Sequence, residues 1–202
     1  PPRTVTGTVR SMGWTGEAPP FYPSEASTAE ERGRVDEVIS RRLYITNYRG
    51  AEDRAELERI KCTHIAAVGT EFMNNSQNRA ATELKIQFWN HDITDDDDQG
   101  ESMGSRLRDA AAFIYNALEP PPKRRKKSKF HPCVLVHCAA GVSRSATVVL
   151  GYLVIYEGRT LRDALALLVA CRPVVWPNDG FMRALLDLEM QVRGAASLTA
   201  EE

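Results

Sequence analysis

The sequence predicts an α/β fold in which a central, mostly parallel, twisted sheet is flanked by helices on both faces. Segments with helical periodicity alternate along the chain with short apolar segments, as in a parallel sheet that is covered on both sides. In the most apolar part of the chain, a strand-like segment (residues 133–136) leads through a short loop into a helix that is apolar on nearly every side (residues 145–156). We expect a central strand and a buried helix in this part, so the loop between them lies at the centre of the fold.

The composition excludes several classes of protein. The chain has 202 residues, of which 43% are hydrophobic and 26% charged, as in a globular domain with a substantial core. Because the net charge is −1, we expect no nucleic-acid partner. The longest apolar runs, such as residues 148–156, are too short to span a bilayer, and the first residues lack the apolar segment of a signal peptide.

The first 34 residues are rich in Gly, Pro, Ser and Thr and predict an extended or partly ordered arm, which either wraps the domain through Trp14, Phe21 and Tyr22 or is a tail. A single domain is expected over residues 35–195, with a C-terminal tail over residues 196–202. Short strands are expected at residues 38–39 and 43–45, and longer ones at 63–68, 83–89 and 133–136. Helices are expected at residues 51–61, 105–118, 145–156, 160–171 and 181–192, with a turn at 177–180.

The four cysteines are scattered and lack the C-x-x-C spacing of zinc sites. This usage favours reduced thiols in a cytoplasmic protein, or in a nuclear one, with no metal site. Cys62, Cys133 and Cys171 are expected to be buried as small hydrophobic residues. Cys133 could also serve as a redox partner of Cys138, but a regular strand between them would keep the two thiols far apart.

Cys138 follows directly on the central strand and opens a loop that ends at Arg144 and Ser145. Backbone N–H groups at the start of a helix converge on one point, and the helix dipole favours negative charge there. Such an environment stabilises a thiolate and lowers the pKa of a cysteine. Arg144 offers a planar fork of donors that matches two phosphate oxygens, and the Ser145 hydroxyl is expected beside the sulfur. The sequence therefore predicts a phosphatase that uses Cys138 as its nucleophile.

The other loop residues fit this interpretation. Gly141 permits a backbone conformation that a side chain would block, while Ala139 and Ala140 keep the loop narrow. Backbone groups would then face the phosphate along the whole loop: Ala139, Ala140, Gly141, Val142, Ser143 and Arg144. His137 is expected to fix the loop by hydrogen bonds, because an ionised thiol needs no base. Two alternatives are an inert buried thiol beside a salt-bridged arginine, and an anion nest without chemistry.

The pattern His137-Cys138-x-x-Gly141-x-x-Arg144-Ser145 resembles the signature loop of the cysteine-dependent protein phosphatases, in the form of the dual-specificity branch. Residues 43–45, 172–173 and 177–181 resemble the early strand and the late turn of that branch, so the resemblance covers roughly residues 35–193. It implies a small, atypical enzyme that hydrolyses phosphotyrosine and phosphoserine or phosphothreonine through a phosphocysteine, without a metal or other cofactor. It also implies that Asn178 supports the site from the late turn.

The resemblance further implies a general acid, an aspartate in the loop that follows the strand before the long helix. That loop covers residues 89–98. Counting forward from the strand selects Asp92, whereas counting back from the helix selects one of Asp95, Asp96, Asp97 and Asp98. We favour Asp92, because a strand end fixes a position better than the length of a loop does.

Residues 123–129, in a loop insert over residues 120–130, form a basic run. A nuclear-import signal, a patch for an anionic surface, a docking patch for a protein kinase and a merely solvated loop all remain open. We expect a monomer whose substrates are phosphorylated proteins. Phosphoinositide phosphatases usually carry lysines within the loop, and none lies between Cys138 and Arg144, so phosphoinositides and other non-protein phosphomonoesters are the alternative substrates. A phospho-binding scaffold without turnover is a weaker alternative.

Overall fold

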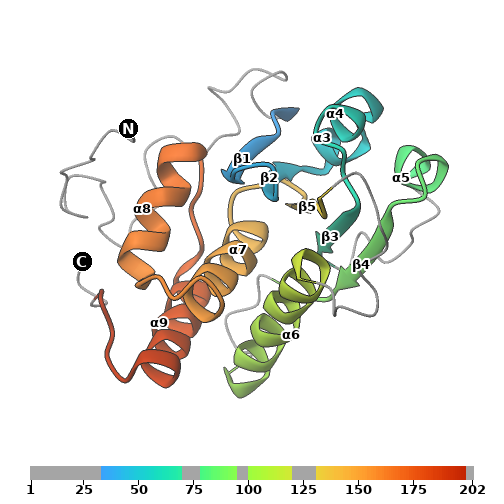
Figure 1. The fold of residues 1–202 in the computed structure, drawn as a ribbon. Coiled ribbons are helices and arrows are strands. Elements are labelled where there is room, and N and C mark those ends of the chain that lie inside the picture. Colours follow the sequence, from blue (N-terminus) through green and yellow to red (C-terminus); the bar gives the residue numbers. More distant parts are fainter. Residues whose placement is uncertain (1–32, 70–77, 95–99, 120–130, 199–202) are drawn as a thin grey trace.

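The computed structural model describes residues 33–69, 78–94, 100–119 and 131–198, and shows a sheet between two layers of helices (Figure 1). Residues 1–32 of the expected arm, Asp95 to Asp98 and the basic run lie outside the described residues. Among the residues described, five strands form one sheet in the order β1-β2-β5-β3-β4. They are β1 (Asp36–Ile39), β2 (Leu43–Asn47), β3 (His64–Val68), β4 (Gln87–His91) and β5 (Val134–Cys138).

The strand β5 occupies the centre of this sheet, as expected for the segment before Cys138. It pairs in parallel with β2 and β3, and β3 pairs in parallel with β4, whereas β1 pairs with β2 in antiparallel fashion. The sheet is therefore mixed, with one antiparallel edge strand. Because the other four strands run the same way, their carboxyl ends meet at one edge, which is where α/β folds bind ligands.

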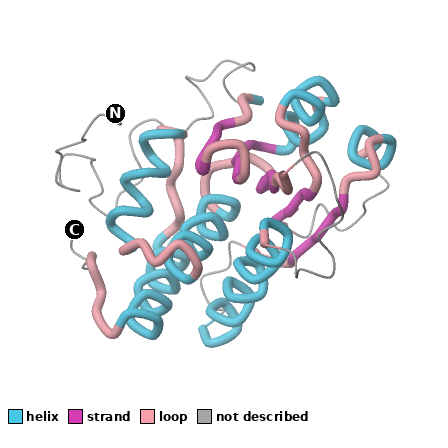
Figure 2. Tube along the Cα trace, in the orientation of Figure 1, coloured by secondary structure: helices cyan, strands magenta, loops and turns pink. Residues whose placement is uncertain are grey.

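Helices cover both faces of the sheet (Figure 2). One face carries the short helices α3 (Tyr48–Glu52), α4 (Arg54–Arg59) and α5 (Arg79–Glu83). The other carries α6 (Gly100–Leu118), α7 (Arg144–Ile155), α8 (Leu161–Cys171) and α9 (Asp179–Arg193). Side chains alternate between the faces along each strand, so Val134 and Val136 join the core under α7 while Leu135 joins the core under α4.

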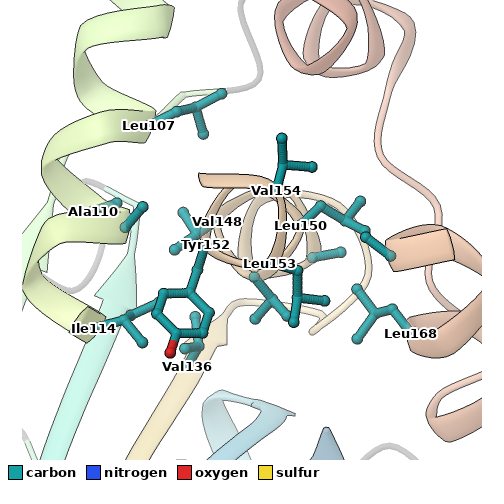
Figure 3. Close-up of a cluster of buried hydrophobic side chains, with 14 of the residues drawn as sticks. Leu107, Ala110, Ile114, Val136, Val148, Leu150, Tyr152, Leu153, Val154 and Leu168 are labelled. Carbon is teal, nitrogen blue, oxygen red and sulfur yellow. The ribbon is translucent and has the colours of Figure 1, made fainter. Parts of the chain in front are cut away.

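The helix α7 forms the centre of the larger core (Figure 3). Its residues from Ser145 to Val154 are all buried, including the polar Thr147. Leu107 and Ile114 of α6 lie on one side of it, Leu168 of α8 on the other, and Val136 of β5 beneath it. A helix packed on all sides cannot shift easily, so its first turn, which carries Arg144 and Ser145, is held rigidly against the end of β5.

Four elements differ from the sequence prediction, the first two for a local reason. The expected helix over residues 51–61 is two helices, because Asn47 accepts hydrogen bonds at the start of α3 and Asp53 does the same for α4. Residues 83–89 are not one strand, since α5 ends at Glu83 and β4 begins at Gln87, with Lys85 in the left-handed region at φ 56°. The helix α6 begins at Gly100, earlier than residue 105, and the expected turn at 177–180 overlaps the start of α9.

The C-terminal segment is packed over its described part. Ser197 donates to the buried carboxylate of Glu189, and Leu198 is 2% exposed within the larger core. The packed part of the chain thus extends at least to Leu198, within the segment that we expected to be a tail. Among the helices of the described residues, none has the length and apolar content needed to cross a bilayer.

Candidate active site

Cys138 is the last residue of the central strand and lies at the carboxyl edge of the sheet. It pairs in register with Asn47 of β2, and the pairing of the neighbouring strands places Val68 and His91 at the same level. The cysteine is 2% exposed. The Gly141 N–H donates to its sulfur, with N 3.2 Å from Sγ, and the Ser145 hydroxyl lies within hydrogen-bond distance, with Oγ 3.2 Å from Sγ and either group able to donate.

Hydrogen bonds from other elements to its backbone carbonyl groups hold the loop between Cys138 and Arg144 from the outer side. Three of them accept hydrogen bonds from other elements: Ala139 O from Tyr48 N at 3.4 Å, Gly141 O from Arg172 Nε at 2.7 Å, and Val142 O from Trp176 N at 2.9 Å. In a trans peptide the N–H points away from the preceding C=O. The N–H groups that follow these carbonyls, on Ala140, Val142 and Ser143, therefore point toward the inner side of the loop. Such convergent N–H groups form an anion nest.

Gly141 adopts the left-handed conformation that the sequence predicted, with φ 69°. A Cβ atom at this position would lie 2.6 Å from the Thr46 carbonyl oxygen and 2.7 Å from Arg172 Nη2. The glycine is therefore required twice, by its backbone angle and by the close approach of β2.

The late turn supports the loop from the side of α9. Asn178 N lies 3.2 Å from Ser143 Oγ, and the Asn178 side chain accepts a hydrogen bond from Phe181 N at the start of α9. Asn178 thus contacts the loop through its backbone while its side chain caps a helix, and its supporting role stays a prediction.

His137 lies on the other face of the sheet from Cys138, because side chains alternate along β5. Its ring meets Phe88 of β4 edge to face, with centroids 6.5 Å apart, and it is 3% exposed. This position agrees with a supporting role and not with a base acting on the Cys138 thiol.

Asp92 follows directly after β4, one residue beyond the level of Cys138. The strand β4 is two positions from β5 in the sheet, a separation of about 10 Å at the usual strand spacing. One carboxylate oxygen, Oδ1, is buried without a hydrogen-bond partner among the described residues, while Oδ2 lies 4.0 Å from Arg106 Nη1. Arg106 also donates to the Asp92 carbonyl oxygen. The Asp92 side chain as a whole is 47% exposed, so part of its carboxyl group is open to solvent.

The other cysteines lie in different surroundings. Cys133 stands at the amino end of β5, about 17 Å along the strand from Cys138. The hydrogen bond with Cys133 and burial raise the pKa of the Cys62 thiol, and burial raises the pKa of Cys171. Both of these thiols are thereby kept protonated and poorly nucleophilic. Within the described part of the chain, no cluster of three or more His, Cys, Asp and Glu side chains is arranged to hold a metal ion.

The model of the dual specificity phosphatase catalytic domain matches residues 43–191. The chain belongs to this family. Dual specificity protein phosphatase 26 of Mus musculus is 35% identical over 157 residues, which cover 75% of this chain and 65% of that protein. Dual specificity protein phosphatase 13B of Mus musculus is 32% identical over 152 residues, covering 75% of this chain and 71% of the relative. The chain thus spans about two thirds of the length of these relatives.

Solved structures of this phosphatase family share the fold. The Yvh1 phosphatase domain from Chaetomium thermophilum superposes with a TM-score of 0.65 at 25% sequence identity, covering 80% of this chain and 97% of the domain. The mixed sheet between two layers of helices is therefore the fold of the dual specificity phosphatases.

Two residues of this site could not be recognised from the sequence. Residues 172–173 were matched only to the late turn of the family, and Asp36 had no role, yet Arg172 and Asp36 both belong to the contacts that hold the loop. Their signal in the sequence was weak: a charged residue at the start of a strand, and an arginine directly before Pro173 where a helix ends.

Proposed function

We propose that this chain hydrolyses phosphotyrosine and phosphoserine or phosphothreonine in proteins through a phosphocysteine intermediate on Cys138. The observation that carries the proposal is the position of Cys138 Sγ, 3.2 Å from both Gly141 N and Ser145 Oγ, beneath a nest of inward N–H groups. A nucleophilic sulfur and an anion-binding loop share one centre, which is the arrangement that phosphoryl transfer to sulfur requires.

In the first step, the thiolate of Cys138 attacks the phosphorus atom and a new S–P bond forms. The bond from phosphorus to the oxygen of the substrate side chain breaks, and Asp92 donates a proton to that leaving oxygen. The loop N–H groups and the Arg144 guanidinium stabilise the charge on the three other phosphate oxygens.

In the second step, a water molecule attacks the phosphocysteine and gives a proton to Asp92, which the first step left ionised. The S–P bond breaks, inorganic phosphate leaves, and the sulfur departs as a thiolate. The Ser145 hydroxyl, 3.2 Å from the sulfur, stabilises this departing thiolate by a hydrogen bond. The protein returns to its starting protonation state without any other reactant.

Turnover measured side by side on phosphotyrosine peptides, phosphothreonine peptides and phosphoinositides tests the substrate class. We expect hydrolysis of both kinds of peptide, with the lipid slower. Turnover of the lipid alone would replace the proposal by a phosphoinositide phosphatase, and phosphate binding without any turnover would identify a scaffold.

Replacing Asp92 by alanine is expected to slow turnover of a substrate with a poor leaving group, such as an alkyl phosphate, by about 100-fold or more. Turnover of a substrate with a good leaving group, such as p-nitrophenyl phosphate, should fall much less, because its leaving oxygen departs without protonation. The measurement is kcat on both substrates for Asp92→Ala and for Asp109→Ala, an exposed carboxylate on α6 that serves as the control.

The leaving-group dependence identifies the acid uniquely. If Asp96→Ala or Asp97→Ala shows it and Asp92→Ala does not, the acid lies later in the loop. An equal loss on both substrates in Asp92→Ala would assign that side chain to folding or to binding.

We further propose that the basic run of residues 123–129 serves recognition or nuclear import of an otherwise cytoplasmic protein. The positions of the described residues on either side of the run support this proposal. Leu118 at the end of α6 and Val134 at the start of β5 both bond to Arg42, at the amino end of β2 and away from Cys138. Replacing its basic residues by glutamine should change partner binding or location and leave kcat/KM on p-nitrophenyl phosphate within about twofold. A large loss of kcat/KM on this small substrate would contradict a position of the basic run away from Cys138.

A further inference from the structure

Arg172 is a buried arginine whose guanidinium touches the phosphate loop (residues 138–144). It follows α8 directly and is 2% exposed. Its Nε donates to the Gly141 carbonyl at 2.7 Å, and its Nη1 donates to Asp36 Oδ2 at 2.7 Å and to the Arg34 carbonyl at 3.1 Å. One side chain therefore joins the loop, the first residue of β1 and the segment before it.

The partner of this arginine is also buried. Asp36 is 6% exposed, and its second oxygen, Oδ1, lies 2.5 Å from Arg34 Nε. A buried charge persists only with a close opposite charge and well-directed hydrogen bonds. In this pair, Asp36 fixes the plane of the Arg172 guanidinium, and the guanidinium in turn fixes the direction of the Gly141 carbonyl.

The direction of that carbonyl decides what the loop offers to an anion. The Val142 N–H belongs to the same peptide unit as the Gly141 carbonyl and points the opposite way, into the nest. If Arg172 released the carbonyl, this peptide could rotate and withdraw a donor from the phosphate. The contact therefore acts on ligand affinity although Arg172 does not itself face the ligand side of the loop.

Further contacts hold the segment of residues 33–36 close to the loop. Thr46 Oγ1 donates to the Arg34 carbonyl at 2.9 Å, and the Thr46 carbonyl lies against Gly141. A Cβ on Gly50 would lie 2.4 Å from the Gly33 carbonyl, so α3 also packs closely on this segment.

We propose that Arg172 is a positioning residue, and that its ion pair with Asp36 holds the phosphate loop in its anion-binding conformation. The inference rests on the proposed function in one respect, that the ligand of the loop is a phosphate group. Phosphate affinity then depends on residues 33–36, which lie where the expected N-terminal arm meets β1.

The test compares two variants of the pair with a matched control in the full chain. Asp36→Asn keeps the size and removes the charge, and Arg172→Lys keeps the charge and removes the fork. Glu189→Gln is the control, because Glu189 is also a fully buried carboxylate but binds Leu161 at the opposite end of α8, about 15 Å along the helix from Arg172. Each protein is titrated with inorganic phosphate by calorimetry, and its thermal unfolding is recorded.

We expect the dissociation constant of phosphate to rise about tenfold in Asp36→Asn and in Arg172→Lys. In Glu189→Gln it should stay unchanged, although this variant should lose about as much thermal stability as the other two. The double variant of Asp36 and Arg172 should lose no more than either single variant, because both act through one ion pair. KM for p-nitrophenyl phosphate should rise in parallel with the phosphate constant.

Unchanged phosphate affinity in the folded pair variants would overturn the inference and leave the proposed function standing. An equal loss in Glu189→Gln would also overturn it, since the effect would then follow stability and not position. Unfolding of both pair variants while Glu189→Gln stays folded would assign the pair to folding alone. Absence of phosphate binding by the unaltered protein would overturn the proposed function and this inference together.

Discussion

Cys138→Ser is expected to reduce phosphomonoester turnover by at least about 1000-fold, because it removes the attacking atom itself. A serine hydroxyl at this position is not ionised at neutral pH, so the attack on phosphorus loses its nucleophile. The carbonyl contacts that orient the loop come from Tyr48, Arg172 and Trp176 and do not involve the sulfur. Phosphate binding and folding should therefore survive, and the variant should retain phosphorylated proteins without releasing the phosphate.

The measurement is kcat on p-nitrophenyl phosphate, together with calorimetric binding of inorganic phosphate. Cys62→Ser is the matched control, since it exchanges sulfur for oxygen at a partly buried site near the amino ends of β3 and β5 and leaves its hydrogen bond to the His64 carbonyl possible. Turnover by the control should stay within about threefold of the unaltered protein. Substantial turnover by Cys138→Ser would show that another group attacks the phosphorus.

The centre of the fold could be predicted because its signals are local. A strand, a thiol, a glycine, an arginine and an apolar helix follow one another within about 20 residues, and each constrains its neighbours through backbone geometry. Local capping also explains why α8 starts at Leu161, next to the expected start at residue 160, since the Thr160 side chain accepts a hydrogen bond from Asp163 N. The structure places the Ser145 hydroxyl and the Gly141 N–H within hydrogen-bond distance of the sulfur, and of these two the sequence had predicted Ser145 alone at that place.

The shell around the loop could not be predicted, because its contacts join distant parts of the chain. Arg172 and Asp36 are separated by 136 positions, and nothing in either segment indicates the other. The break between α3 and α4 depends on Asp53, an aspartate that periodicity alone places inside a helix. For the general acid, strand pairing aligns the end of β4 with Cys138, but the alternatives Asp95 to Asp98 lie outside the described residues, so the choice of Asp92 stays a prediction.

Gly141→Ala is expected to destabilise the protein and to weaken phosphate binding strongly. The control Gly158→Ala separates the effect of backbone strain from that of loop displacement. Both glycines are left-handed, with φ 69° and φ 66°, so alanine costs about 1–2 kcal/mol at either site through backbone strain alone. A Cβ on Gly158 meets nothing within 4 Å, whereas one on Gly141 would overlap the Thr46 carbonyl and the Arg172 guanidinium. Relief of that overlap costs a further 1–3 kcal/mol or so and displaces the loop.

Thermal unfolding and phosphate titration of the two variants distinguish strain from displacement. Gly158→Ala should lower the unfolding midpoint by a few degrees and bind phosphate as the unaltered protein does, because its strain lies after α7 and touches no part of the loop. Gly141→Ala should unfold at a still lower temperature and, while folded, bind phosphate at least about 100-fold more weakly, since moving Gly141 away from Thr46 moves both its own N–H and that of Val142. Equal phosphate affinity in the two variants would mean that the loop tolerates displacement, and that its N–H groups are not what binds the anion.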